Sequence, residues 1–213
     1  MCRQPIALAA VAFAAALAAA PIVQACEGNQ VLLQDDFKTM ASNWGAASGN
    51  QTVKDGKMVL TPALNATYVT LDGGFVFTDM DACVDVVIIK GGPRMVHTYG
   101  GFAFWATDHQ NYYELMIGPS GTFGVDRIMP GRRITIMPFA TSSAVKSGVG
   151  QVNRLRVKTK GNIATLYING IQVGTIAGQR AAGRRRSWRH GASGTQNPRR
   201  LRVLESESHQ LTR

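Results

Sequence analysis

Two acidic and two aromatic side chains in the middle of the chain have the chemistry to bind or cleave a sugar. Trp105 and Tyr112 can stack on the apolar face of a pyranose ring, and Glu114 and Asp126 can form an acid/base pair. Each has a plainer alternative: the rings pack laterally against neighbouring strands, and the carboxylates are solvated surface groups. We expect the solvated role for the acids, because charged residues are mostly exposed, and the sequence leaves both roles of the rings open.

Metal-binding patterns are weaker than this sugar-binding pattern. Asp35-Asp36 and Asp79-Met-Asp81 offer hard oxygen ligands of the kind that calcium prefers. Neither has the spacing of a calcium loop, so we expect these acids to stabilise turns and caps instead. The sequence therefore predicts no cofactor, with calcium as an alternative that no motif supports.

The elements that must position these residues are β-strands. Short runs rich in β-branched and aromatic residues alternate with turns of Gly, Pro, Asn and Asp. The runs span residues 31–37, 57–61, 67–71, 82–89, 101–105, 111–117, 122–125, 133–136, 153–159, 163–168 and 171–176. Asn169-Gly170 lies between the last two and favours a type I′ hairpin. We predict an all-β fold, a two-sheet antiparallel β-sandwich of the jelly-roll type.

The period of two predicts which residues share a face of a strand. If the runs 101–105, 111–117 and 122–125 are neighbours in a meander, one outward face holds four of the residues named above. These are Trp105, Tyr112, Glu114 and Asp126. We predict that this face carries the binding site, with Glu114 and Asp126 as the candidates for catalysis.

Several segments of the central region resemble the concanavalin A-like lectin/glucanase superfamily. They are Gly101-Phe-Ala-Phe-Trp-Ala, Asn111-Tyr-Tyr-Glu-Leu, Pro119-Ser-Gly-Thr-Phe, Asn153-Arg-Leu-Arg-Val and Leu166-Tyr-Ile-Asn-Gly170. Within that superfamily they are most similar to the laminin-G-like and 3-keto-disaccharide-hydrolase-type domains of secreted bacterial proteins. The resemblance covers about residues 31–177, and it implies a jelly roll that often has a glycan-binding concave face. It implies no activity, because this fold hosts lectins, hydrolases and interaction modules.

Three functions remain open at this point. The first is a non-catalytic, lectin-like domain that binds carbohydrate or another extracellular ligand. The second is a glycoside hydrolase of the 3-keto-disaccharide type, although the Glu-x-Asp-x-x-Glu strand of the related glucanases is absent from the sequence. The third is a structural or adhesion module. We favour the first, so enzymatic activity is left uncertain and the oligomeric state is left open.

The N-terminal residues 1–25 read as a secretory signal peptide. Arg3 precedes an apolar run that is too short to span a bilayer, and Val23-Gln24-Ala25 fits a small-x-small cleavage site loosely. We therefore expect a secreted or periplasmic protein without a membrane span, and a lipoprotein is the less favoured alternative. Cys26 and Cys83 would be the cysteines of the mature chain, and in an oxidising compartment they are candidates for a disulfide, with two free thiols as the alternative.

The formal net charge of +10 invites a nucleic-acid partner, but most of it lies in the C-terminal tail. Residues 180–213 hold 9 Arg and 2 acids, whereas residues 26–179 hold 13 basic and 11 acidic residues. We therefore expect no nucleic-acid partner for the folded domain, 26–179, and a basic, disordered tail, 180–213. The stripe Arg154, Arg156 and Lys158 is expected to be a solvated face, because no stacking aromatic residues interleave it.

Arg without Lys, mixed with Ala and Gly, is also typical of a GC-rich gene read in a shifted frame. Read one base over, with permitted codons chosen freely, Pro198–Thr212 can encode Arg-Ala-Ala-Tyr-Ala-Phe-Trp-Ser-Leu-Lys-Val-Thr-Asn and a stop. That is an alternating strand of the kind that closes a jelly roll. We therefore hypothesise a frameshift near residue 179 and a sandwich lacking its closing strand, and sequencing the gene in close relatives tests this.

Overall fold

The structure is a computed structural model of the chain, and it confirms the predicted all-β, two-sheet antiparallel sandwich. It describes residues 26, 31–63, 66–73, 77, 79–89, 98–179 and the backbone of 202–204. The expected signal peptide and all but three residues of the basic tail lie outside the described residues. Within the described part of the chain, no helix has the length and apolar character needed to cross a membrane.

Twelve strands and one short 3₁₀ helix make up the described fold. Their bounds are β1 Val31–Gln34, η1 Ser42–Trp44, β2 Gln51–Lys54, β3 Lys57–Leu60, β4 Asp81–Val87, β5 Gly100–Asp108, β6 Asn111–Gly118, β7 Thr122–Met129, β8 Arg132–Thr141, β9 Val152–Lys160, β10 Ile163–Ile168, β11 Ile171–Ala177 and β12 Arg202–Leu204. One sheet has the order β1-β12-β4-β9-β10-β11, the second is the meander β5-β6-β7-β8, and β2 pairs with β3.

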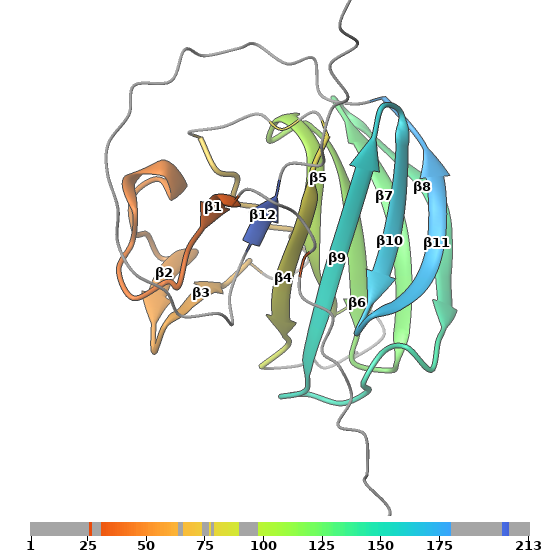
Figure 1. The fold of residues 1–213 in the computed structure, drawn as a ribbon. Coiled ribbons are helices and arrows are strands. Elements are labelled where there is room, and N and C mark those ends of the chain that lie inside the picture. The colour runs from red at the N-terminus through yellow and green to blue at the C-terminus, as the bar shows by residue number, and fades with distance from the viewer. Residues whose placement is uncertain are drawn as a thin grey trace, which may run out of the picture.

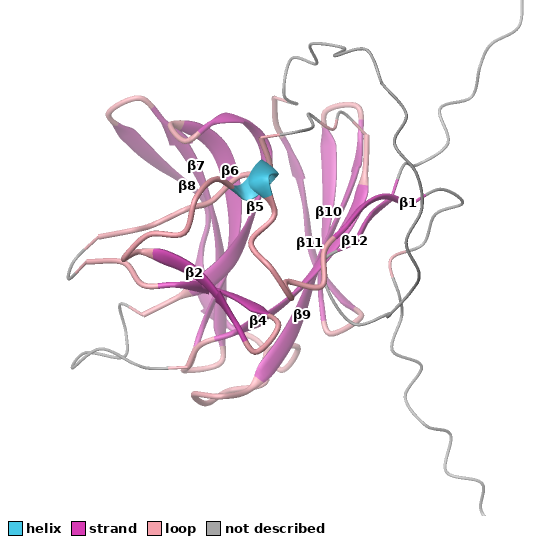
Figure 2. Ribbon diagram, turned by 90° about the vertical axis from the view of Figure 1, so that its left-hand side faces the viewer, coloured by secondary structure: helices cyan, strands magenta, loops and turns pink. Residues whose placement is uncertain are grey.

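The two large sheets pack face to face and bury the core between them. In Figure 1, β9, β10 and β11 lie in front of the β5–β8 sheet, and β1, β2 and β3 lie to one side. Turned by 90°, Figure 2 shows the two layers with the β2–β3 hairpin and the 3₁₀ helix in front of them. Alternate residues of facing strands fill the interlayer space, because strand side chains point to opposite faces in turn. The fully buried ones include Leu115, Val125, Leu155, Val157 and Leu166.

Turn chemistry sets the register of the hairpins as predicted. Asn169 and Gly170 have φ values of 52° and 86°, which is the left-handed conformation that a type I′ turn needs at both positions. They join β10 to β11, with Ile168 paired directly to Ile171. The Asn169 side chain also donates hydrogen bonds to the Ala144 carbonyl oxygen and to Asn153 Oδ1, both at 2.8 Å. The turn is therefore tied to the neighbouring loop as well as to its own strands.

Two strand predictions were wrong. Residues 67–71 form no strand, and their side chains bond to other segments: Thr67 Oγ1 lies 2.7 Å from Tyr99 Oη, and Thr70 Oγ1 donates to the Trp44 carbonyl oxygen. The prediction also missed β2, whose polar sequence gives a weak strand signal but pairs with β3 through a two-residue turn. β12, which consists of residues of the printed reading frame, lies between β1 and β4. A strand that closes the sandwich would lie at this position.

Candidate functional site

The outer face of the β5–β8 sheet carries the residues that the sequence analysis singled out. In β6, Tyr113, Leu115 and Ile117 face the core, so the alternate residues Tyr112 and Glu114 face outward. Glu114 pairs directly across the ladder with Asp126 of β7, which puts both carboxyl groups on that face. The prediction of a common face therefore holds for Tyr112, Glu114 and Asp126.

A single arginine joins the two acids. Arg133, near the start of β8, places Nη1 2.6 Å from Oδ2 of Asp126 and 2.9 Å from Oε1 of Glu114. Its other terminal nitrogen, Nη2, donates to the Tyr99 hydroxyl at 3.4 Å, and the guanidinium lies 5.9 Å from the centre of that ring. Both carboxylates are nearly buried, whereas the Arg133 side chain is 39% exposed. Of Glu114, Asp126 and Arg133, it is thus Arg133 that a ligand can reach from solvent.

These acids are not the solvated surface groups that we expected. Glu114 and Asp126 are each only 6% exposed, and the guanidinium of Arg133 supplies the compensating charge that a buried carboxylate requires. Arg133 lies close to Glu114, but no hydrogen bond in the described part of the chain reaches Oε1 with good alignment. Oε1 is itself buried, and the charged Nη1 of Arg133, 2.9 Å away, is the group that faces it.

Burial dominates the electrostatics of this face. It raises the pKa of Glu114, the nearby Asp126 charge raises it further, and Arg133 opposes the shift without cancelling it. Burial, together with the charge of Glu114, raises the pKa of Tyr112 to about 12, so this phenol stays neutral. Burial lowers the pKa of Arg133, but the hydrogen bond to Asp126 and the charge of Glu114 raise it to a value above its ordinary range. Arg133 is therefore a fixed positive charge.

Aromatic rings border the arginine on its exposed side. The rings of Tyr99 and Phe139 are 6.2 Å apart, and Phe139, near the end of β8, is 46% exposed. The ring of Phe139 lies over Gly124 of β7, where a side chain would leave it no room. We call the group of Tyr99, Tyr112, Glu114, Asp126, Arg133 and Phe139 the outer-face site.

Substitution of Gly124 tests how tightly this ring is seated. A β-carbon at residue 124 would lie 2.9 Å from Cδ2 of Phe139 and 3.2 Å from the Met137 carbonyl oxygen. We expect Gly124→Ala to displace the ring and to lower the free energy of unfolding by about 1–3 kcal/mol, the usual cost of overpacking. Urea unfolding measures it, with Gly49→Ala as the control because nothing lies within 4 Å of a β-carbon there. Equal stability of the two variants would contradict this placement.

Trp105 does not lie on the outer face, which corrects the prediction from strand parity. It is 3% exposed and belongs to the core, with its ring 5.3 Å from Tyr113 and 5.5 Å from Phe104. Its φ of 48° is left-handed, and the β5–β6 register breaks directly after Phe104. This bulge turns two successive side chains to the core, because an extra residue interrupts the alternation of a strand.

Sequence reasoning missed Arg133, Tyr99 and Phe139. The run 133–136 was predicted as a strand, but β8 extends to Thr141 and changes register twice against β7. Those two irregularities decide which side of the sheet Phe139 occupies, and the sequence gives no sign of them. The available signal was Arg133 itself, a charged residue that begins a β-branched run beside a meander with two outward acids.

The acids that we considered for calcium have structural partners. Asp35 accepts hydrogen bonds from the Phe37 backbone N–H and from Trp44 Nε1, both at 2.7 Å. Asp79 accepts one from the Gly161 backbone N–H at 2.7 Å. The bond from Asp35 to Phe37 is the turn role that we expected, whereas Asp79 holds the turn between β9 and β10 from a distant part of the chain. Asp81 belongs to a different cluster, with Arg156.

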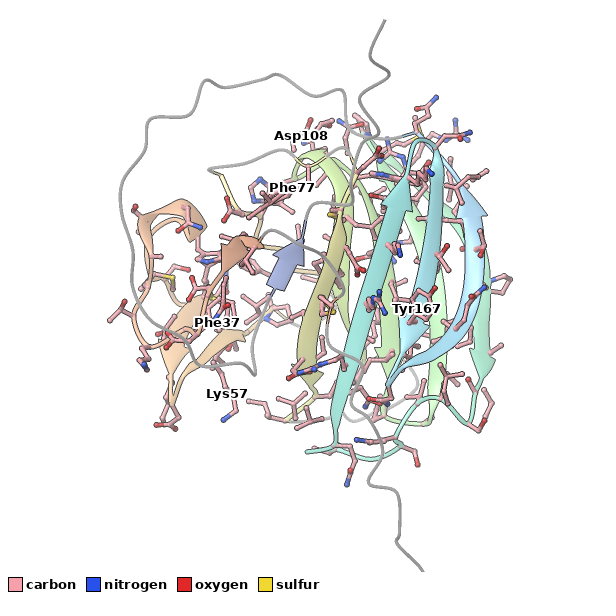
Figure 3. The ribbon with its side chains drawn as sticks, in the orientation of Figure 1. Phe37, Lys57, Phe77, Asp108 and Tyr167 are labelled. Atoms are coloured by element: carbon pink, nitrogen blue, oxygen red, sulfur yellow. A yellow bond between two sulfur atoms is a disulfide. The ribbon has the colours of Figure 1, made fainter. Side chains whose placement is uncertain are left out.

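Of the basic stripe on β9, Lys158 is exposed as we expected, but the two arginines are not solvated. Arg156 is 4% exposed and forms a two-pronged ion pair with the buried Asp81, from Nε to Oδ1 at 2.7 Å and from Nη2 to Oδ2 at 2.5 Å. Arg154 pairs in the same way with Asp85, at 2.7 and 2.8 Å. The Arg156 guanidinium lies 5.0 Å from the centre of the Tyr167 ring, which Figure 3 shows on the front of the sheet. Arg154 and Arg156 therefore fasten β9 to β4, and these two arginines are not free to bind a polyanion.

A disulfide joins Cys26 to Cys83 on the same outer side of β4. The Cα atoms are 5.9 Å apart, and the bond closes a sequence separation of 57 residues. Both cysteines are buried, at 7% and 5% exposure. The bond ties the region after the expected cleavage site to the middle of the larger sheet.

Comparison with known proteins gives structural neighbours only. No protein-family model and no curated protein matches the chain. The carbohydrate-binding module CBM66 from Bacillus subtilis aligns at 14% identity and a TM-score of 0.42, over 60% of this chain and 66% of the module. Sheep galectin-11, in complex with glycerol, aligns at 10% identity and a TM-score of 0.38, over 61% of this chain and 84% of the galectin. The catalytic domain of an endo-1,3-beta-glucanase (laminarinase) from Thermotoga petrophila aligns at 12% identity and a TM-score of 0.44. The alignment covers 70% of this chain and 77% of that domain.

All three neighbours have concanavalin A-like jelly-roll folds, the group that the sequence resembles. This chain spans slightly less than two thirds of the first of them. At these identities the likeness concerns the fold alone, so function has to be argued from the site.

Proposed function

We propose that this protein is a secreted or periplasmic, non-catalytic domain that binds carbohydrate at the outer-face site. The observation that carries the proposal is Arg133, half-exposed and held by two buried carboxylates beside the exposed ring of Phe139. A guanidinium donates several hydrogen bonds in a fixed plane, which suits the hydroxyl and ether oxygens of a sugar. An adjacent aromatic ring offers an apolar surface to the C–H face of the same sugar.

The charges of the site favour a neutral ligand over an anionic one. Glu114 and Asp126 together offset the single positive charge of Arg133, so a carboxylated or sulfated sugar meets no net attraction there. The disulfide supports the compartment, because such bonds persist in oxidising surroundings.

A glycan array tests the proposal. We expect binding of neutral glycans that falls about tenfold or more in Arg133→Lys, which keeps the charge but loses the planar donor geometry, and also in Phe139→Ala. Ile171→Ala is the matched control, because Ile171 is also exposed but lies on β11 of the other sheet. Absence of glycan binding, or equal losses in the control, would reject the proposal and leave the structural or adhesion module.

One observation favours a glycoside hydrolase as the second candidate. Glu114 has a raised pKa and a carboxylate partner opposite it in the ladder, as a general acid requires. Arg133 counts against this role because its guanidinium bridges both carboxylates. Release of reducing sugar from array-positive glycans, abolished in Glu114→Gln, would establish the hydrolase instead of the lectin.

The raised pKa of Glu114 also predicts how stability changes with pH. Its folded-state pKa lies above the ordinary value of 4.5, so the folded protein holds this proton more tightly than the unfolded chain does. Its contribution is then complete below the ordinary value and is lost as pH rises through the folded-state pKa. We expect the unfolding free energy of the wild type, relative to Glu114→Gln, to decrease over that window in urea titrations. A flat or rising difference would contradict the shift.

A further inference from the structure

Arg127 is a positive charge at one end of the space between the two large sheets. It follows Phe123 and Val125 on the core-facing side of β7, and it pairs across the ladder with the core residue Tyr113. Its guanidinium lies 4.7 Å from the centre of the Tyr113 ring, and the residue is partly exposed. The core thus ends at this position in an arginine that solvent can reach.

Backbone groups hold this guanidinium in place. Its Nη1 donates to the carbonyl oxygens of Tyr112, at 3.0 Å, and of Ile128. In the part of the chain that the structure describes, no hydrogen bond or ion pair engages its Nε or Nη2. These two atoms form one edge of the guanidinium plane, and their N–H bonds point the same way. Arg127 therefore presents two fixed, parallel donors without an acceptor among the described residues.

Two other arginines of this protein show what the same edge binds. Arg154 donates from Nε and Nη2 to the two carboxylate oxygens of Asp85, at 2.7 and 2.8 Å. Arg156 does the same to Asp81. Two parallel donors match the two oxygens of a carboxylate in spacing and direction. The free edge of Arg127 thus suits a carboxylate, and none of the described acids supplies one.

The charges around Arg127 favour an anion. Arg132 of β8 is exposed and is a diagonal neighbour on the same face, because it pairs with the residue two positions after Arg127. Asp126 lies on the opposite face of β7 and is bound by Arg133. Asp108, which Figure 3 shows at this end of the fold, accepts hydrogen bonds within its own turn. The two arginines together outweigh this one acid.

We infer that Arg127, with Arg132 beside it, is a binding site for the carboxylate group of a small acidic ligand, such as a sugar acid. The carboxylate accepts two hydrogen bonds from Nε and Nη2, and Arg132 adds attraction through its charge. Because two carbonyl groups and the Tyr113 ring already hold the guanidinium, it loses little freedom on binding. The inference does not rest on the proposed function, because the outer-face site lies on the opposite face of the same sheet.

Nuclear magnetic resonance of the arginine Nε–H groups tests the site on the oxidised protein. The probes are sodium acetate and sodium glucuronate, and the controls are sodium chloride and glucose at the same concentrations. We expect both carboxylates to move the Nε–H signal of Arg127 downfield in a saturable way, because a charge-assisted hydrogen bond forms there. Neither control should move it. No shift with the carboxylates, or an equal shift with either control, would overturn the inference.

The two probes also distinguish the source of the carboxylate. Tighter binding of glucuronate than of acetate would support a sugar acid, because the ring then adds contacts of its own. Equal binding would support the site for a carboxylate of any origin and would overturn the sugar acid as its ligand.

Other arginines provide controls in the same spectra. The Nε–H groups of Arg154 and Arg156 already donate to carboxylates, so their signals should not move. Arg133 is bridged to two carboxylates and should not move either. A shift at Arg133 alone would overturn the site at Arg127. It would also contradict the neutral ligand proposed for the outer-face site, so the two proposals fail in distinguishable ways.

Two variants separate the donor pair from the charge. Arg127→Lys keeps a positive charge but lacks the parallel donors, so we expect about tenfold weaker binding of glucuronate, followed at the backbone amide signals of β7. Arg132→Gln removes a charge at an exposed position and should weaken binding about two- to threefold, an effect that high salt abolishes. Unchanged binding in Arg127→Lys would overturn the inference. The wild-type titration needs neither variant, so it decides the outcome even if Arg127→Lys does not fold.

Discussion

Replacing Asp81 by alanine should lower the free energy of unfolding by about 3–5 kcal/mol, the largest effect that we expect from a single substitution. Asp81 is fully buried and holds Arg156 by two hydrogen bonds, and Arg156 is itself only 4% exposed. Its removal leaves a buried guanidinium without its counter-charge. Urea unfolding followed by circular dichroism measures the loss.

Asp85→Ala is the matched control, because Asp85 pairs with Arg154 on the same two strands and in the same geometry. Asp85 and Arg154 are both partly exposed, so water replaces the lost interaction and the cost should stay near or below about 1 kcal/mol. The double variant Asp81→Leu with Arg156→Met should recover most of the loss, because it removes both charges together. A loss in Asp81→Ala no greater than in the control would contradict the buried pair.

Loss of the Cys26–Cys83 disulfide should lower the free energy of unfolding by about 4 kcal/mol, the value expected for a closed loop of this length. The bond restricts the unfolded chain more than the folded one, because it links residues 57 positions apart. Thermal and urea unfolding of Cys26→Ser with Cys83→Ser, beside the wild type, measures the effect.

The reducing agent serves as the second arm of this experiment. Dithiothreitol should lower the stability of the wild type to that of the double serine variant and leave the variant unchanged. An unfolding free energy of the wild type that does not change with the reductant would show that the cross-link contributes nothing. A double serine variant as stable as the oxidised wild type would show the same.

Local patterns in the sequence were sufficient for the fold and for half of the candidate site. The period of two placed Tyr112, Glu114 and Asp126 on a common face, because β6 and β7 pair without interruption there. The same rule failed for Trp105, because a bulge and a left-handed residue break the alternation in β5. Neither feature has a sequence signal at a residue that is not glycine.

The burial of the charges could not be predicted from local patterns either. Whether Arg156 is solvated depends on Asp81, which lies 75 positions away in the chain. The burial of Glu114 likewise depends on Arg133, from a strand whose register shifts twice. Long-range pairings of this kind decide whether a charged residue is a surface group or a structural one.

The position of β12 also affects how the protein is made. β1 is among the first described residues to leave the ribosome and β12 the last, yet β1 joins its sheet through β12. The N-terminal strand therefore waits for almost the entire chain to be synthesised before it can pair, and contacts between such distant segments form slowly. The larger sheet therefore reaches its full strand order only after residues 202–204 have been synthesised, whichever of its other strands pair first.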